Sequence, residues 1–119
     1  MLLGGRLDKQ SIAATGAMAA EAAAGITADL ALLTLPGVHP EQGLTGNDPE
    51  VAATQRILIS RSAETYAMAS IEKLGTVAAC RIAGVSEVTG IITDAPNSHP
   101  VLQRLRDQGA TIIAASTAG

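Results

Sequence analysis

The sequence predicts an α/β fold in which a mainly parallel sheet carries helices on its faces. Short apolar runs alternate along the chain with stretches of helical pattern, in the order strand, helix, strand, helix, strand, strand, helix, strand. The clearest run, at residues 30–35, is almost continuously apolar, as is typical of parallel strands buried on both faces. Because parallel strands need crossover connections, which are usually helical and right-handed, this alternation favours a parallel sheet.

The composition suits one globular domain and excludes several classes of function. Of the 119 residues, 47% are hydrophobic and 16% are charged, a balance that excludes disorder as the main state. The net charge of −3 lacks the basic footprint of a free-standing nucleic-acid binder. Tyr66 is the one aromatic residue, so base-stacking platforms are excluded. The single cysteine, Cys80, requires no oxidising compartment.

The first elements are short. Leu2 and Leu3 are expected to end a strand, and residues 12–14 form a weak second run. Residues 17–24 have a helix-friendly composition that stops at Gly25. Neither a signal peptide nor a membrane span of about 20 apolar residues is visible here. We therefore expect a cytoplasmic protein.

The middle of the chain contains the clearest helix. Residues 36–48 are rich in proline and glycine and are expected to form a loop. Asp48 then suits the position that caps the free amides of a helix, and Pro49 suits the first helical position. Apolar residues recur through about Ser62 and form one stripe.

The C-terminal half continues the alternation. The predicted elements are strands at residues 65–70, 91–93 and 111–114, and a helix that begins at Asn97 or Ser98 and ends at Gly109. In parallel sheets ligands bind beyond the carboxyl ends of the strands. The loops in which a site is expected are therefore residues 36–48, 71–75 and 94–98.

A phosphate-binding turn is one interpretation of residues 43–48. Two glycines, the hydroxyl of Thr45 and Asn47 lead directly into a helix N-terminus, where free amides favour an anion. The alternative is that these residues only form turns and a cap, and Asp48 already brings negative charge to that helix end. The spacing matches no nucleotide-binding motif.

Lys73 and Asp94 each follow a predicted strand. A lysine at the carboxyl edge of the sheet can pair with a phosphate, although Lys73 can equally be a solvated side chain beside Glu72. Asp94 suits contact with a sugar hydroxyl or, equally, a turn. His39 and His99 have no partners at metal-like spacing, so we expect no metal, no cofactor and no catalytic set.

An ordered series of segments resembles the C-terminal effector domain of DeoR-type transcription regulators. The similarity runs from about Leu2 to Ala115, and the order of the segments is more specific than any one motif. The series comprises Leu-Gly-Gly-Arg at 3–6, Gly16, Asp-Leu-Ala-Leu-Leu at 29–33, Gly37-Val38, Gly43-Leu44-Thr45, the helix around Arg56, Glu-Lys-Leu-Gly at 72–75 and Ile-Ile-Thr-Asp at 91–94.

The resemblance implies a sensor of phosphorylated sugars that controls operator binding by an N-terminal winged helix-turn-helix domain. It implies a three-layer fold of the ribose phosphate isomerase and coenzyme A transferase type. The lysine of the family's Ser-Lys-Phe-Gly turn falls on Lys73. The ligand-binding residues expected from the residue patterns and the resemblance together are Lys73, Gly37, Gly43, Thr45, Asn47 and Asp94.

The sequence also departs from the family pattern. Compared with the family pattern, we expect the DNA-binding domain and the first strands of the effector domain to be absent from residues 1–119, which would then be a partial sensor domain that does not bind DNA alone. Leu35 and Pro36 stand where related isomerases carry carboxylates, and neither can act as a base. This favours sensing without turnover.

Two alternatives remain open at this point. An isomerase-like enzyme would need a carboxylate base in the 36–48 loop, where Glu41 and Asp48 are available. An oligomerisation module would use the edge that a truncated sheet exposes. Self-association is also expected of the sensor, because a ligand that favours one dimer arrangement would change the spacing of the DNA-binding domains.

Overall fold

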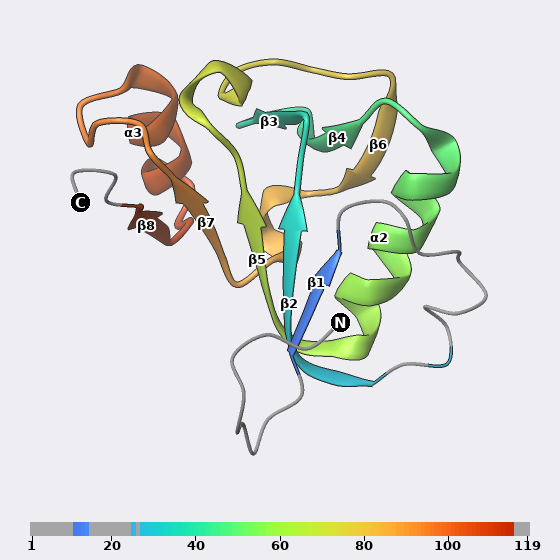
Figure 1. Cartoon of the computed structure of the whole chain (residues 1–119). Helices are drawn as coiled ribbons and strands as arrows, with labels where there is room; N and C mark the ends of the chain where they lie inside the picture. Colours follow the sequence, from blue (N-terminus) through green and yellow to red (C-terminus); the bar gives the residue numbers. More distant parts are fainter. Residues whose placement is uncertain (1–10, 15–24, 26, 116–119) are drawn as a thin grey trace.

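A five-stranded parallel sheet forms the centre of the protein (Figure 1). The computed structural model describes residues 11–14, 25 and 27–115. The strands, in their order across the sheet, are β1 (Ser11–Ala14), β2 (Ala28–Thr34), β5 (Ser62–Met68), β7 (Gly90–Thr93) and β8 (Ile112–Ala114). Every neighbouring pair is parallel. The predicted α/β class with a parallel sheet is thus confirmed. The strand end predicted at Leu2 and Leu3 and the helix predicted at 17–24 lie outside the described residues.

One face of this sheet is more deeply buried than the other. Ala31 and Leu33 of β2 are fully buried, and so are Ala67 of β5 and Ile91 of β7. Leu30 and Leu32, on the opposite face of β2, are half-buried. Residues 30–35 are therefore less completely enclosed than their continuous apolar character predicts.

Helix α2 (Pro49–Arg61) covers the buried face and begins as the sequence predicts. The Asp48 side chain accepts hydrogen bonds from the first free amides of the helix, and Pro49 occupies the first turn. The helix packs against β2, β4, β5 and β6. Its inward side buries Ala52 and Leu58 in the hydrophobic core. β5 then starts at Ser62, directly after the helix and three residues earlier than predicted.

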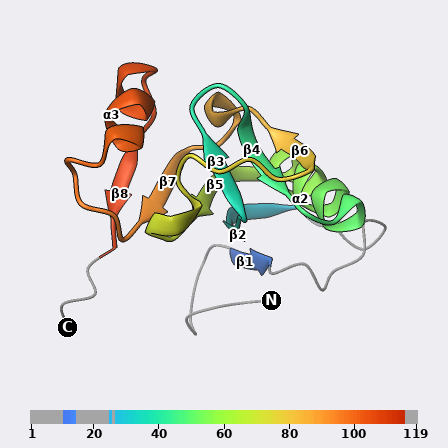
Figure 2. The same cartoon turned by 90° about the horizontal axis from the view of Figure 1, so that it is seen from above.

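A second, antiparallel sheet replaces the loop predicted at residues 36–48. It consists of β3 (Gly37–His39), β4 (Gly43–Gly46) and β6 (Cys80–Ala83), with β4 in the middle. The small sheet lies beyond the arrowheads of β2 and β5 in Figure 1, and it lies toward the viewer when the molecule is seen from above in Figure 2. The loop prediction was wrong because strands of three or four residues show no detectable periodicity, and β4 gains its second partner from a distant segment.

Helix α3 (Pro100–Asp107) joins β7 to β8. It begins at Pro100, later than the predicted start at Asn97 or Ser98, because the Nδ1 atom of His99 accepts the hydrogen bond from the Val101 amide and so caps the helix. Leu102 and Leu105 extend into the core. Gly109 follows with φ of +91°, a left-handed conformation that ends the helix without steric cost.

Two short 3₁₀ helices complete the described fold. They are η1 (Ile71–Lys73), after β5, and η2 (Val85–Glu87), after β6. Within the described part of the chain, no helix has the length and apolar character needed to cross a bilayer.

Candidate functional site

A cavity of about 430 Å³ lies where β2 ends, between α2 and η1. Its volume is in the range of small-molecule binding pockets. Three segments supply its wall: the residues at the end of β2, those at the end of β4 with the start of α2, and η1. The lining residues are Thr34, Leu35, Pro36, Gly46, Asn47, Asp48, Val51, Gln55 and Lys73.

The carboxyl ends of the central parallel strands are joined next to this cavity. The Leu35 amide donates to the Met68 carbonyl oxygen over 3.1 Å, which links the chain leaving β2 to the end of β5. The Ala69 amide donates to the Ile92 carbonyl oxygen over 3.0 Å, which links β5 to β7 in the same way. The cavity therefore lies at the edge of the sheet where ligands of parallel α/β proteins bind.

Lys73 is placed in the cavity wall by η1, which is attached on two sides. The Asp94 side chain, just beyond β7, accepts a hydrogen bond from the Ile71 amide over 2.9 Å. The Gly75 amide donates to the Val38 carbonyl oxygen of β3 over 2.7 Å. Lys73 lies between these two attachments and is half-buried. The ammonium group is thus carried by a turn that both sheets hold in position.

Gly75 and Thr76 close this turn. Gly75 has φ of +85°, which a residue with a Cβ adopts only with strain. The Thr76 hydroxyl donates to the carbonyl oxygens of Lys73, at 2.8 Å, and Pro36, at 3.1 Å. These bonds connect two segments of the cavity wall, those that contain Pro36 and Lys73.

The N-terminus of α2 is already occupied by a side chain. Asp48 Oδ1 accepts from the Glu50 amide at 2.8 Å and from the Val51 amide at 3.5 Å. The amides on which the phosphate-binding turn depended are therefore engaged by Asp48 itself. What remains for an anion on this side of the cavity is the exposed Asn47, whose side-chain amide can donate hydrogen bonds.

Gln55 is a cavity residue that the sequence did not suggest. It is 1% exposed, and its Nε2 donates to the Thr34 carbonyl oxygen over 3.2 Å. Its Oε1 atom is buried and has no hydrogen-bond partner within the described residues. A glutamine in the second turn of an amphipathic helix is normally exposed, and no local sequence signal distinguishes this one.

The six residues expected to bind a ligand fall into two groups. Lys73 and Asn47 line the cavity together, so η1 and the end of the 43–47 segment do meet at one rim. Gly37, Gly43, Thr45 and Asp94 are not among its lining residues.

Structural contacts account for three of these four positions. A Cβ on Gly37 would come 2.4 Å from the Thr45 hydroxyl, and one on Gly43 would come 2.5 Å from the Ala83 carbonyl oxygen. The buried Thr45 hydroxyl accepts from the Ala78 amide over 2.9 Å. Asp94, the fourth, holds η1 as described above.

The electrostatic character of the cavity is mixed. Lys73 and Asp48 are the two charged residues in its wall. A smaller cavity of about 240 Å³ adjoins it, with Lys73, Asn47 and Pro36 in both walls and Glu72 in the second.

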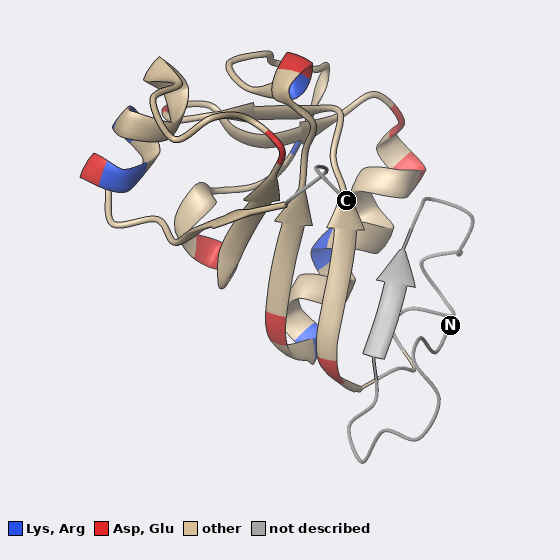
Figure 3. Cartoon of the chain, turned by 60° about the vertical axis from the view of Figure 1, so that its left-hand side comes forward, with Lys and Arg blue, Asp and Glu red and all other residues tan. Residues whose placement is uncertain are grey.

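The backbone amide of Glu72 and the hydroxyl of Ser70 hold the pKa of the Glu72 carboxyl below its ordinary value of 4.5, and the Lys73 ammonium adds to this effect. Elsewhere the charged residues are scattered over helices, loops and strands (Figure 3).

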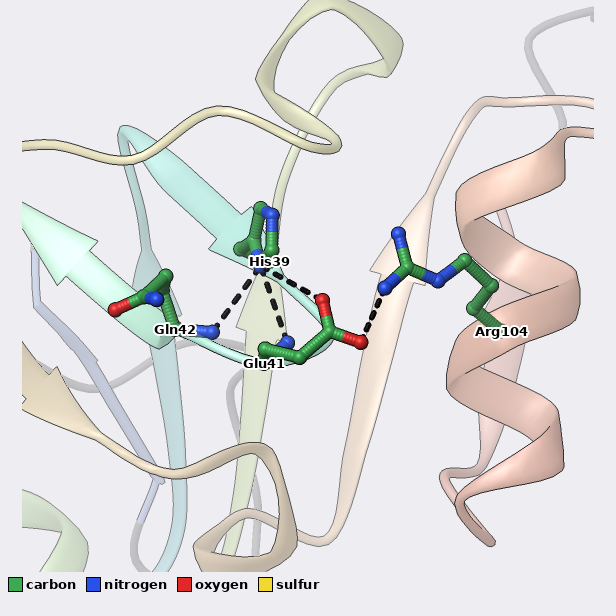
Figure 4. Close-up of polar contacts among 4 residues, drawn as sticks. All are labelled: His39, Glu41, Gln42 and Arg104. Atoms are coloured by element: carbon green, nitrogen blue, oxygen red, sulfur yellow. Dashed lines mark hydrogen bonds and ion pairs between the residues drawn. The ribbon is translucent and has the colours of Figure 1, made fainter.

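A separate polar cluster lies in the loop between β3 and β4 (Figure 4). His39 Nδ1 accepts from the amides of Glu41 and Gln42, each at 3.1 Å. The Glu41 carboxylate approaches the same nitrogen to 3.5 Å. Glu41 also pairs with Arg104 of α3. None of these residues lines the cavity at the end of β2. Among the described residues no group of three or more histidine, cysteine or acidic side chains could hold a metal ion.

The fold and the cavity together define a class of protein. A parallel α/β sheet with a cavity at its carboxyl edge and one lysine in the wall is compatible with a domain that binds a small anionic ligand. Comparison of the sequence with known families identifies the family. The chain belongs to the DeoR C-terminal sensor domain family, whose sequence model matches residues 1–95.

A relative supports the same assignment. The chain is 32% identical over 94 residues to a protein of Bacillus subtilis (strain 168) described as an uncharacterized HTH-type transcriptional regulator, FruR. The alignment covers 79% of this chain and 38% of that protein. The chain is thus a regulatory domain rather than an enzyme, and the isomerase alternative is not supported.

Proposed function

We propose that this domain binds a phosphorylated sugar in the cavity at the end of β2, and that binding controls DNA recognition by a helix-turn-helix domain of the whole regulator, which acts in the cytoplasm. The single observation that carries this proposal is the wall of one cavity: Lys73 and Asn47 provide donors for an anion, and Gln55 provides an acceptor. Of the other expected ligand residues, Gly37, Gly43, Thr45 and Asp94 would act by shaping the rim and holding η1. The proposed fold type is the three-layer one of ribose phosphate isomerase and coenzyme A transferase.

The charge distribution supports a ligand that is both anionic and hydroxylated. Lys73 favours a phosphate as a compact cation. Asp48 and Gln55 carry oxygens, which accept hydrogen bonds from hydroxyl groups but oppose a phosphate placed beside them. Leu35, Pro36 and Val51 supply apolar surface for the carbon atoms of a sugar. A free phosphate uses only the first of these features, whereas a sugar phosphate uses all of them.

Calorimetric titration of the chain tests this function. We expect heat of binding with at least one of glucose 6-phosphate, fructose 6-phosphate and ribose 5-phosphate, and at least roughly tenfold weaker binding of the corresponding free sugars. Lys73→Met should weaken binding roughly tenfold or more, because hydrogen bonds to charged groups contribute about 1.5–3 kcal/mol.

The matched control is Arg81→Met. Arg81 is an exposed cation of β6 that does not line the cavity, so its loss should leave the affinity within about twofold. If no phosphorylated sugar binds, or if both variants weaken binding equally, the cavity is not the site.

Self-association belongs to the same proposal. β8 is at one end of the described parallel sheet, and Ile113 on this strand is 39% exposed. Strands at the edge of a sheet readily pair with another chain. Light scattering at increasing concentration should show a dimer, and Ile113→Lys should reduce it, since charged edge residues oppose pairing. A monomer at all concentrations would contradict this part.

A further inference from the structure

The side chain of Gln55 is buried, and its amide oxygen has no hydrogen-bond partner among the described residues. The amide group carries an oxygen that accepts and a nitrogen that donates. The nitrogen is engaged by the Thr34 carbonyl oxygen at 3.2 Å, whereas Oε1 has no partner among the described residues. A buried carbonyl without a donor is costly, and most such groups in proteins find a partner.

The orientation of the amide is fixed by its surroundings. Exchanging Oε1 and Nε2 would place an oxygen against the Thr34 carbonyl oxygen, so two acceptors would face each other. Gln55 therefore offers an acceptor and not a donor to whatever supplies the missing bond. Gln55 and Thr34 both line the cavity that contains Lys73.

The missing donor is identified by the remaining wall. A cationic donor such as an ammonium group is disfavoured because Lys73 carries the same charge in the same cavity. The negative charge of Asp48 is held at the N-terminus of α2, where its Oδ1 accepts from the Glu50 and Val51 amides. A phosphate oxygen would oppose Oε1, since both are acceptors. A neutral donor avoids both conflicts, and in a phosphorylated sugar that donor is a hydroxyl.

We infer that Gln55 accepts a hydrogen bond from a ligand hydroxyl through Oε1, and that this residue makes the cavity select a hydroxylated phosphoester over a phosphate without such a group. This inference rests on the proposed function and adds a direction to it. The phosphate lies toward Lys73 and Asn47, and a hydroxyl of the sugar lies toward Gln55.

The test measures the ratio between the affinity for a sugar phosphate and the affinity for inorganic phosphate. Glucose 6-phosphate, fructose 6-phosphate and ribose 5-phosphate are each compared with inorganic phosphate, and the tightest is also compared with its available deoxy or anhydro analogues. Calorimetry is carried out with the unaltered full chain, with Gln55→Met, which keeps the length and apolar stem of the side chain, and with Gln103→Met as a matched control. Gln103 is exposed on α3 and lies outside the cavity.

In the unaltered chain we expect the preferred sugar phosphate to bind at least roughly tenfold more tightly than inorganic phosphate and than one of its deoxy analogues. Gln55→Met should reduce this ratio to about threefold or less while it leaves the affinity for inorganic phosphate unchanged. Gln103→Met should leave both affinities and their ratio unchanged. Circular dichroism and the melting temperature show whether Gln55→Met keeps the fold, and Gln55→Leu, which also removes the acceptor and should reduce the ratio in the same way, provides a second variant if it does not.

The outcomes separate this inference from the proposed function. If the sugar phosphates bind and depend on Lys73, but Gln55→Met keeps the full ratio, then Oε1 is satisfied by water, the inference fails and the proposed function stands. If neither inorganic phosphate nor any sugar phosphate binds the unaltered chain, the proposed function fails and the inference fails with it.

Discussion

The carboxylate of Asp94 accepts a hydrogen bond from the Ile71 amide across 2.9 Å and so joins the end of β7 to η1. Two residues after Ile71 the chain presents Lys73 to the cavity. The sequence suggested this exposed acidic residue as a contact for a sugar hydroxyl, whereas in the structure it holds the turn that carries the lysine.

Removal of this bond should affect ligand binding as well as stability. We expect Asp94→Ala to lower the free energy of unfolding by about 1 kcal/mol, the usual net value of one hydrogen bond, and to weaken sugar phosphate binding several-fold. Asp94→Asn keeps a side-chain oxygen and should retain most of both. Urea denaturation and calorimetry measure the two effects. An unchanged affinity in a less stable Asp94→Ala would show that Asp94 does not position Lys73.

The cap of α2 provides a prediction about stability. Asp48→Ala should lower the free energy of unfolding by about 1 kcal/mol, because two amides of the first turn lose their acceptor. Asp48→Asn, which preserves an acceptor at the same place, should cost clearly less. Urea denaturation gives both values. Equal losses in the two variants would mean that the carboxylate charge, rather than the cap, provides the stabilisation.

Substitution of two glycines with positive φ distinguishes the cost of backbone strain from the cost of a steric clash. Gly43 has φ of +84° and would place a Cβ 2.5 Å from the Ala83 carbonyl oxygen, whereas Gly109 has φ of +91° and nothing within 4 Å. Gly109→Ala should therefore cost only the conformational term, about 1–2 kcal/mol. Gly43→Ala should cost more, because it adds a clash between β4 and β6. Thermal and urea denaturation compare the stabilities of the two variants. Equal losses of stability would show that β4 and β6 move apart at little cost to relieve the clash.

Glu72 gives the chain a predictable response to acid. Its pKa is lowered by hydrogen bonds from its own amide and from Ser70, and by Lys73. A carboxyl whose pKa is lowered in the folded state stabilises that state above its ordinary pKa, and the contribution disappears as the pH falls through the lowered value. The unaltered chain should thus be more stable than Glu72→Gln at pH 7, and the difference should shrink below about pH 4. A difference that is constant with pH would exclude this origin.

The same substitution should also strengthen anion binding. Glu72 lies beside Lys73 and is ionised at neutral pH, so it competes with a ligand phosphate for the ammonium group. We expect Glu72→Gln to bind sugar phosphates about two- to threefold more tightly at pH 7, a modest gain because exposed charges are screened by solvent. Weaker binding would indicate that Glu72 orients Lys73 rather than competing with the ligand.

The elements that the sequence predicts correctly are those with local signals. The Asp48-Pro49 pair marks the start of α2 through capping chemistry that acts within one turn. The β2 and β7 runs are apolar enough to mark buried strands by themselves. The antiparallel sheet has no such signal, because β4 contains two glycines and β6 lies more than thirty residues further along the chain. Its strands form because tertiary pairing outweighs local preference.

The candidate site follows the same division. Lys73 and Asn47 are found from the sequence, because both are polar and lie in loops expected at the carboxyl edge of the sheet. Gln55 is not found, because a polar residue on a helix looks exposed unless the depth of its position is known. That depth depends on where Thr34 ends β2 relative to α2, which only the assembled fold determines.

The two hydrogen bonds that attach η1 to the sheets restrict movement of the Lys73 backbone. One bond runs from Ile71 to Asp94 beyond β7, and the other runs from Gly75 to Val38 of β3. Any shift of the Lys73 backbone must stretch one of these bonds or slide the antiparallel hairpin against the central strands. A ligand that moves the Lys73 backbone would therefore also act on the spacing between the two sheets.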